Sequence, residues 1–391
     1  MAETTTKNTR QTVQMLDFRR EFSAIRSEIL DAITEVCDSQ RFILGPQVER
    51  FEAAAAAACG VPHAAGCASG TDALWLALAA LGIGPGDAVV TTPFSFFATA
   101  SSILRAGAVP ILADIDPKTF NLSPAAVEER LKQSPVGASR IAAVMPVHLY
   151  GQCADMDALA TLALQYDLRL IEDAAQAFGA AWNGVRAGGL GDAAAFSFYP
   201  TKNLSAMGDA GMVTTRSAET DERVRMLRTH GMRRRYFHDE IGWNARMDTI
   251  QAAVLEVKLR RVDAGNARRR EIAALYDRLF RDAGLVGAKV GEGIVLPWTD
   301  PRAEHVFHQY VIRAPRRDAV RAFLAEEGVG SEIYYPLPLH EQESLAFLGY
   351  RKGDFPESER AANEVLALPI YPELREDEVK LVVDAIRRFY A

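Results

Sequence analysis

The sequence lacks the cysteine patterns, long apolar runs and hydrophobic N-terminal segment that are typical of secreted, membrane or metal-binding proteins. Its four cysteines, at positions 37, 59, 67 and 153, have neither the paired spacing of a metal site nor the density of a disulfide framework. No apolar run reaches the ~18–20 residues that cross a membrane. The polar N-terminal stretch MAETTTKNTRQT lacks the hydrophobic segment of a signal peptide. We therefore expect a cytoplasmic chain with no membrane partner.

The chain also lacks an excess of basic residues. Its 44 lysines and arginines face 51 aspartates and glutamates, for a net charge of −7. This balance argues against a nucleic-acid partner, because such proteins present a basic face. One basic cluster is present, formed by Arg233, Arg234 and Arg235. Short charge runs are usually solvated loops, although this one would also suit an anionic small molecule.

Apolar runs of strand length alternate with helical patterns between residues 87 and 175. The runs are continuously apolar rather than alternating, which is typical of a parallel sheet covered on both faces by helices. SPAAVEERLKQ shows a typical helix start, with a serine cap followed by proline. The stretch 87–96 is predicted to be a strand that runs into a loop. The other predicted strands are 109–116, 140–150 and 168–175, and the predicted helices are 98–107, 123–133 and 155–167.

The pattern changes after about residue 245. A long helical stretch follows, interrupted near Gly265, and then shorter elements of both kinds. The predicted elements are helices at 247–284 and 317–328, strands at 308–315 and 330–336, and a terminal helix from Glu376.

The sequence therefore predicts an α/β fold with two domains, since single cores stop growing near ~250–300 residues. The large domain, residues 15–255, has a mixed, mostly parallel sheet sandwiched by helices. The smaller α+β domain covers residues 256–391. Residues 1–14 are expected to form a flexible tail.

A possible phosphate site lies in CASGTDALWLALAALG (67–82). Ser69, Gly70 and Thr71 begin an apolar helix, where free backbone N–H groups and the helix dipole attract anions. Glycine would allow a ligand to approach the backbone closely. The alternative is a plain helix cap.

A second group of polar residues follows predicted strands, where ligands of parallel sheets collect. Asp173 ends an apolar strand, so its carboxylate needs a partner, and Gln176 lies beside it. Ser197 and Lys202 follow the run AAAFSFYP. An ordinary lysine, with a pKa near ~10.4, is neutral in only roughly one molecule in two thousand at pH 7. Lys202 would need desolvation or a cationic neighbour to act as a nucleophile. Taken singly, such residues are more often a helix cap and a surface charge.

Together these parts match what pyridoxal 5′-phosphate (PLP) requires: a lysine, a carboxylate for the pyridinium and a phosphate cradle. Phe96, in FSFFATA, follows a strand and could stack on the ring, with core packing as the alternative. His340, in YYPLPLHEQ, has no metal-ligand partner at a recognisable spacing, so we expect no metal site.

An ordered series of motifs runs over nearly the whole chain, from LDFRREF (16–22) to the terminal helix. It includes SGTDAL, PFSFFATA, ILADID, HLYGQCADMDAL, IEDAAQAFGA, GDAAAFSFYPTKNL, GDAGMV and GWNARMDTIQAAVLEVKL. This series resembles the DegT/StrS family of sugar aminotransferases, which have the aspartate-aminotransferase-like fold type I of PLP enzymes. The resemblance implies that Lys202 forms the Schiff base. It further implies that Asp173 pairs with the pyridine nitrogen, with Gln176 beside it, and that Phe96 stacks on the ring.

The resemblance also implies how the phosphate is held. Ser69, Gly70, Thr71 and Ser197 would surround it. Asn244, in GWNARMD, matches an asparagine that such enzymes lend to the phosphate of the neighbouring subunit, which implies a homodimer with shared active sites.

The implied reaction moves an amino group from L-glutamate to a 3- or 4-keto sugar carried by a nucleoside diphosphate. The basic cluster and Arg246 could meet the anionic sugar nucleotide. Tyr334, Tyr335 and His340 lie in a segment similar to the family, without an assigned role.

Two alternatives stay open. A PLP-dependent sugar dehydratase is disfavoured because its family relatives replace the lysine with histidine, whereas Lys202 is present here. A non-catalytic regulatory protein on the same fold is the other, since a fold does not fix a function. The set Lys202, Asp173 and Ser197 argues against it.

Overall fold

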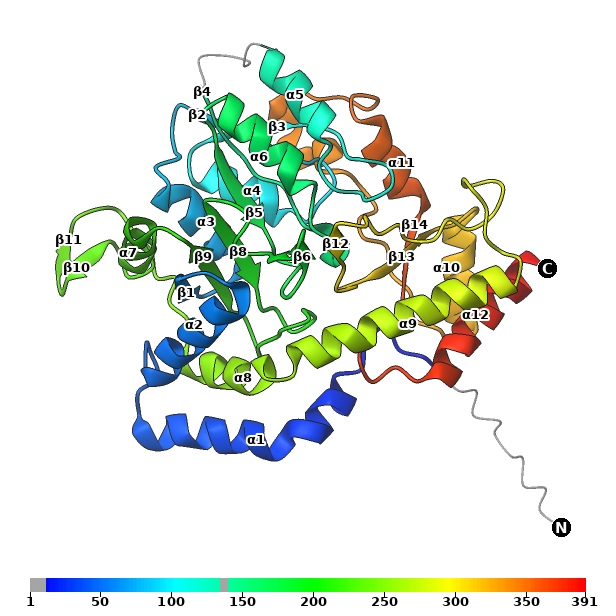
Figure 1. Cartoon of the computed structure of the whole chain (residues 1–391), viewed down its shortest axis with the longest axis horizontal. Helices are drawn as coiled ribbons and strands as arrows, with labels where there is room; N and C mark the ends of the chain where they lie inside the picture. The colour runs from blue at the N-terminus through cyan, green and yellow to red at the C-terminus, as the bar shows by residue number, and fades with distance from the viewer. Residues whose placement is uncertain (1–11, 134–139) are drawn as a thin grey trace.

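A computed structural model describes residues 12–133 and 140–391 (Figure 1). The helices are α1 (Phe18–Ser39), α2 (Pro46–Cys59), α3 (Gly70–Ala80), α4 (Ala98–Arg105), α5 (Pro124–Lys132), α6 (Met156–Gln165), α7 (Ala218–Leu227), α8 (Thr249–Leu259), α9 (Val262–Asp282), α10 (Arg317–Glu326), α11 (Pro356–Glu364) and α12 (Glu376–Tyr390), with short 3-10 helices at Leu149–Gly151, Leu339–Glu341 and Glu343–Leu348. The strands are β1 (His63–Cys67), β2 (Asp87–Thr91), β3 (Val109–Leu112), β4 (Arg140–Val144), β5 (Arg169–Asp173), β6 (Ala181–Trp182), β7 (Val185–Arg186), β8 (Ala193–Ser197), β9 (Gly211–Thr215), β10 (Met232–Arg234), β11 (Phe237–His238), β12 (Ala303–Glu304), β13 (Tyr310–Arg313) and β14 (Val365–Leu368).

The central sheet has seven strands in the order β1-β9-β8-β5-β4-β2-β3. Strand β9 runs antiparallel to both of its neighbours, and the other pairs are parallel. This confirms the predicted mixed, mostly parallel sheet. Parallel strands end at the same edge, so the residues that follow β5 and β8 meet there. Asp173 of β5 stands opposite Ala195 of β8, two residues before Ser197.

Helices cover both faces of this sheet, as the continuously apolar strands predict. Successive strand residues enter different cores: Val89 and Ile171 pack with α3, α4 and α7, whereas Val90 and Leu170 pack with α2, α6 and α8. The period of two in a strand explains this division. The elements predicted between residues 87 and 175 are present, but the strands end earlier than predicted. The remaining residues form the loops that carry the candidate site.

The C-terminal part packs β13 and β14 against α9, α10 and α12 around a separate apolar core. Two predictions about this part need correction. The long helix is interrupted as predicted, but the break lies at Arg260 and Arg261, between α8 and α9, a few residues before Gly265. Gly265 lies inside α9, where a Cβ would come within 3.3 Å of Pro372, so it serves close packing. Residues 330–336 form no strand, and only Glu332 bridges to β14.

The N-terminal segment joins the C-terminal core. Residues 1–11 lie outside the described residues, but Val13, which falls in the predicted flexible tail, is 1% exposed. Its N–H donates to the carbonyl of Gly328 at 2.9 Å, and its carbonyl accepts from the N–H of Gly330 at 2.8 Å. An apolar side chain at position 13 therefore fixes the chain there. The domain boundaries at 255 and 256 stay a prediction. Within residues 12–133 and 140–391, no helix is both long and apolar enough to span a bilayer.

Candidate active site

Lys202 lies in the turn that follows β8. Its backbone N–H donates to the carbonyl of Tyr199 at 2.8 Å, which closes the turn. The side chain is partly buried, and burial lowers the pKa of its amine from 10.5 to about 8. The negative charge of Asp173 acts in the opposite direction and raises this pKa. A lysine of this kind is available as a neutral nucleophile near physiological pH.

Polar side chains from α8 and α9 hold the loop that carries Lys202. Asn203 donates from its side-chain amide to Asn266 of α9 at 2.7 Å. Lys258 of α8, which is 8% exposed, donates from Nζ to the hydroxyl of Ser205 at 2.9 Å. These bonds hold two residues that follow Lys202 and so fix the backbone from which its side chain extends.

Asp173 is the carboxylate whose charge acts on Lys202. It is 3% exposed at the end of β5, with Oδ2 accepting from the Thr99 hydroxyl at 2.8 Å and Oδ1 from the N–H of Ala175 at 3.3 Å. Burial raises its pKa, while the two hydrogen bonds and the charge of Lys202 lower it. The net rise means that these partners do not fully compensate the loss of water, so the carboxylate would gain from a further cation.

The predicted phosphate cradle is partly a helix cap and partly a close contact between two elements. Ser69 caps α3, because its Oγ accepts from the N–H of Asp72 at 3.0 Å. A Cβ on Gly70 would lie 2.5 Å from the Cβ of Ser197, so only glycine allows the helix start to approach the end of β8. Thr71 lies in the same first turn and is partly exposed. The structure therefore brings the predicted phosphate residues of these two elements together.

Gln176 and Phe96 meet at a residue from the distant C-terminal segment, Tyr335. Gln176 donates from Nε2 to the Tyr335 hydroxyl at 3.1 Å and accepts from the N–H of Tyr150 at 2.7 Å. The Phe96 and Tyr335 rings are 6.3 Å apart. Phe96 is 60% exposed, so the core-packing interpretation is wrong. Burial, together with the charge of Asp173, raises the pKa of Tyr335 and keeps its hydroxyl protonated.

Within residues 12–133 and 140–391, no hydrogen bond joins the Asn244 side chain to these residues. It is exposed, and its Oδ1 accepts from Nε of Arg246 at 3.1 Å. Its segment runs beside the end of β1, where the N–H of Ala68 donates to the carbonyl of Ala245 at 3.0 Å. The neighbouring Trp243 is 49% exposed. Asn244 is thus free to face another chain.

The basic cluster is a solvated hairpin. Arg233, Arg234 and Arg235 lie on or beside β10, in the β10–β11 hairpin that projects from the body of the molecule (Figure 1). All three are exposed. Arg234 lies over the ring of Phe237 at 3.5 Å, and Arg235 lies over that of Tyr236 at 4.9 Å. The hairpin contacts none of the site residues above within the described chain.

His340 and Tyr334 have partners that their spacing in the sequence does not reveal. The His340 ring is buried, and its Nε2 lies 3.0 Å from Oε1 of Glu359 and 3.8 Å from Oε1 of Glu341. The sequence predicts no partner at a recognisable spacing, and these carboxylates come close to His340 only through the fold. The N–H of Gly353 also donates to the same Glu359 oxygen, at 2.6 Å. Tyr334 accepts a hydrogen bond from the Tyr150 hydroxyl at its backbone carbonyl.

Sequence reasoning missed two contributors next to Asp173. One is Thr99, whose hydroxyl binds the carboxylate. The other is a fully buried pair in which His148 Nε2 lies 3.0 Å from Glu172. His148 Nδ1 accepts from the N–H of Ala154 at 3.2 Å, which leaves Nε2 to face the Glu172 carboxylate. The only available signal was polar residues within apolar strand ends, in PVHLYG and LIEDAA.

Comparisons with known proteins agree with this geometry. The sequence pattern of the DegT/DnrJ/EryC1/StrS aminotransferase family matches residues 23–387. A pleiotropic regulatory protein of Geobacillus stearothermophilus is 48% identical over 97% of this chain and 98% of its own. A UDP-N-acetyl-3-dehydro-alpha-D-glucosamine 3-aminotransferase of Acidithiobacillus ferrooxidans is 43% identical over 98% of this chain and 99% of its own.

Solved structures extend the match to three dimensions. DesV of S. venezuelae, in complex with a ketimine intermediate, superimposes with a TM-score of 0.91 at 42% identity, over 97% of this chain and 98% of that one. Fold and sequence thus agree along the chain. The chain belongs to the DegT/DnrJ/EryC1/StrS aminotransferase family.

Proposed function

We propose that the protein is a PLP-dependent aminotransferase that moves an amino group from L-glutamate to a 3- or 4-keto sugar of a nucleoside-diphosphate sugar. The observation that carries the proposal is that Lys202, whose pKa is lowered to about 8, and the buried carboxylate of Asp173 lie at the carboxyl ends of β8 and β5, where their charges act on each other. The names of the relatives support the substrate class, because one of them aminates a UDP-linked 3-dehydro sugar.

The residues present fit PLP in three respects. With a pKa of about 8, roughly a quarter of the Lys202 amine is neutral at pH 7.5. Asp173 is a buried carboxylate with a raised pKa, which a protonated ring nitrogen would compensate. The contact of Gly70 with Ser197 leaves no side chain between the first turn of α3 and the Ser197 hydroxyl. Backbone N–H groups at such a helix start bind phosphate.

Each of these residues would then have a separate role in the reaction. Bound PLP supplies an electron sink that stabilises negative charge on the substrate carbon. Asp173 holds the proton on the ring nitrogen, and Thr99 and Ala175 orient its two oxygens. Lys202 Nζ, held by its clamped loop, takes and returns the proton at the substrate carbon. Phe96 is exposed beside Tyr335 and offers its face to the ring.

We further propose a homodimer in which Asn244 reaches the phosphate of the neighbouring active site. The segment around Asn244 exposes Tyr236, Phe237, Ile241 and Trp243 at 74%, 54%, 86% and 49%. Large apolar residues gathered on one surface commonly mark an interface. The four cysteines are free thiols, and the cytoplasm, where thiols stay reduced, is the expected location.

Hybrid dimers test the shared site. Pairing a Lys202→Ala chain with an Asn244→Ala chain leaves one intact site per dimer if the two residues come from different chains. Purified hybrids should then have about half of the wild-type activity, well above either homodimer. Hybrids no more active than the homodimers would show that both residues serve the same chain.

A regulatory function is the second candidate, because the 48% identical relative is named a pleiotropic regulatory protein. Such a protein need not transfer amines. The lowered pKa of Lys202 favours catalysis, since a binding module has no use for a neutral amine.

The main experiment records the visible spectrum of the purified protein with PLP, before and after L-glutamate. We expect a yellow band that bleaches with glutamate, and amine transfer to a keto sugar nucleotide detected by mass spectrometry. Lys202→Ala should abolish both, whereas Lys352→Ala, at an exposed lysine, should keep both. A band that glutamate leaves unchanged, without amine transfer, would support the regulatory candidate instead.

A further inference from the structure

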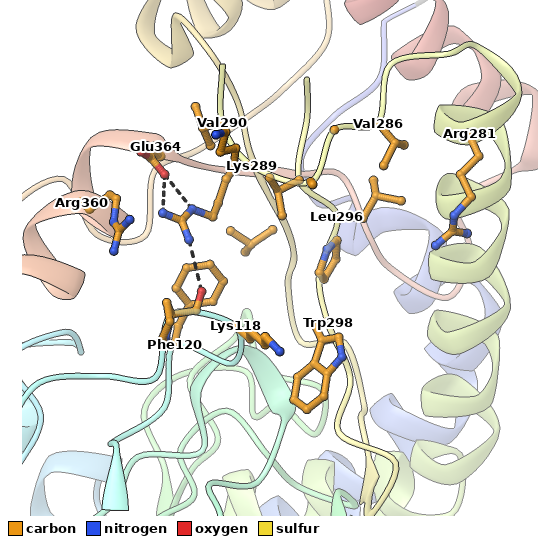
Figure 2. Close-up of a pocket in the computed structure, with 17 residues that line it drawn as sticks. Lys118, Phe120, Arg281, Val286, Lys289, Val290, Leu296, Trp298, Arg360 and Glu364 are labelled. Carbon is orange, nitrogen blue, oxygen red and sulfur yellow. Dashed lines mark hydrogen bonds and ion pairs between the residues drawn. The ribbon is translucent and has the colours of Figure 1, made fainter. Parts of the chain in front are cut away.

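A cavity of about 520 Å³ lies apart from the Lys202 site. It is bounded by residues 117–120 after β3, by the segment 286–298, by β13 and by α11 (Figure 2). Ligand sites of small molecules usually have volumes of about 300–1,000 Å³. Among the residues that line it are none of those assigned to the candidate active site.

A buried aromatic wall separates the cavity from the active site. Phe120 lines the cavity, and its ring packs 5.7 Å from Tyr150 and 6.3 Å from Phe94. Phe94 in turn packs 6.3 Å from Tyr335 of the active site. Phe94, Phe120 and Tyr150 are each 5% exposed or less. A ligand in the cavity would therefore occupy a second, distinct place.

The lining is strongly basic in a chain whose net charge is −7. Five basic side chains line the cavity and only one acidic side chain does. They come from separate segments, and Figure 2 shows the four that it labels on different sides of the space, so their charges add in the middle. The basic residues are Lys118, Arg281, Lys289, Arg313 and Arg360, and the acidic one is Glu364.

These cations differ in how far they are already neutralised. Arg313 is engaged: its Nε donates to Glu364 at 2.7 Å and Nη1 to the carbonyl of Pro117 at 3.2 Å. Arg281 and Lys289 pair outward, at 3.4 Å and 3.1 Å, with carboxylates that do not line the cavity. Lys118 has no carboxylate within ion-pair distance in the part of the chain that the structure describes. An anion in the cavity would give Lys118 its missing partner.

An aromatic surface lies next to this free cation. The Nζ of Lys118 is 5.6 Å from the centre of the Trp298 ring, and Figure 2 shows the two side chains together. Trp298 is 40% exposed, and Val286 and Leu296 add an apolar surface beside it. Exposed tryptophan rings stack on planar heterocycles, as in nucleotide-binding sites.

We propose that this cavity is a second binding site, for a phosphorylated compound that carries a planar ring, with nucleoside diphosphates as its representatives. Lys118 pairs with the phosphates, assisted by Arg281 and Lys289, and Trp298 stacks on the base. More than one phosphate suits the several cations around the space. The site goes beyond the proposed aminotransferase activity and does not depend on it.

The test measures UDP binding to the PLP-loaded full-length protein by equilibrium dialysis. We expect one UDP per chain in the cavity, in addition to any UDP held at the active site. Lys118→Gln should weaken the cavity site about tenfold, and Trp298→Ala should weaken it about tenfold or more. Lys352→Gln removes the same charge from an exposed lysine outside the cavity and should leave binding unchanged.

Each outcome decides the matter. About tenfold weaker binding of one UDP per chain in both cavity variants, with melting temperatures like that of the wild type, supports the site. Equal binding in the wild type and both variants overturns it, since all UDP would then be elsewhere. Pyrophosphate binding as tightly as UDP overturns the role of Trp298 and hence the ligand class. Failure of amine transfer alone would refute the proposed function and leave this stoichiometry as it is.

Discussion

The lowered pKa of Lys202 leads to a measurable pH profile. We expect the apo-protein to capture PLP at a rate that follows the neutral fraction of the Lys202 amine. With a pKa of about 8, half of the amine is neutral at pH 8, compared with roughly 0.3% for an ordinary lysine at 10.5. Burial therefore makes the amine about 150-fold more available at this pH.

The carboxylate of Asp173 should shift the midpoint of this pH profile in a direction that can be tested. The charge of Asp173 raises the pKa of Lys202, so Asp173→Asn should lower this pKa further and move the midpoint below pH 8. Asp209→Asn is the matched control, because Asp209 is an exposed aspartate in the same loop. Stopped-flow absorbance from pH 6 to beyond pH 10.5 measures the capture rate of all three proteins.

The refuting results are specific. A wild-type midpoint near pH 10.5 would mean that the amine is not desolvated. An upward shift in Asp173→Asn, or an equal downward shift in Asp209→Asn, would mean that Asp173 does not act on Lys202 through its charge.

Three further predictions concern the surroundings of Lys202. Gly70→Ala places a Cβ 2.5 Å from that of Ser197, which should cost about 1–3 kcal/mol and weaken PLP binding; an unchanged melting temperature and PLP affinity would contradict the close approach. Lys258→Met removes the bond to Ser205 and should lower kcat more than it raises KM, because the loop loses its position; unchanged kinetics would show that Asn203 suffices. Phe96→Ala should weaken PLP binding up to about tenfold while the melting temperature stays the same, since the ring is 60% exposed; unchanged affinity would exclude ring stacking.

Much of the fold could be predicted because local patterns and global packing agree. The Ser123 cap before Pro124 is present as predicted, with its side chain accepting from the N–H of Ala126 at 3.4 Å. The continuously apolar strands led to the correct layers. The prediction of a strand at 330–336 was wrong. The β-branched and aromatic residues of this segment favour a strand locally, but packing turns Tyr335 toward Gln176 instead.

The sequence predicted only those site residues that lie at, or shortly after, the end of a predicted strand. Asp173 and Lys202 follow strands whose direction the sequence reveals. Thr99 could not be found, because in ATASSILR it looks like any polar residue of a helix, and its partner comes 74 residues later. The same holds for Tyr335, which lies 159 residues beyond Gln176. Such pairs follow from how elements pack, and a single sequence does not contain that information.

The clamped loop after β8 also has a consequence for local stability. Side-chain bonds tie this loop to α8 and α9, and the backbone bond from the Ala206 N–H to the carbonyl of Phe198 at 2.7 Å closes it. We expect the amide protons of this segment to exchange with solvent mainly when the packing of α8 or α9 opens as well. Although Lys202 belongs to a connecting segment by sequence, its backbone would then share the local unfolding free energy of these two helices.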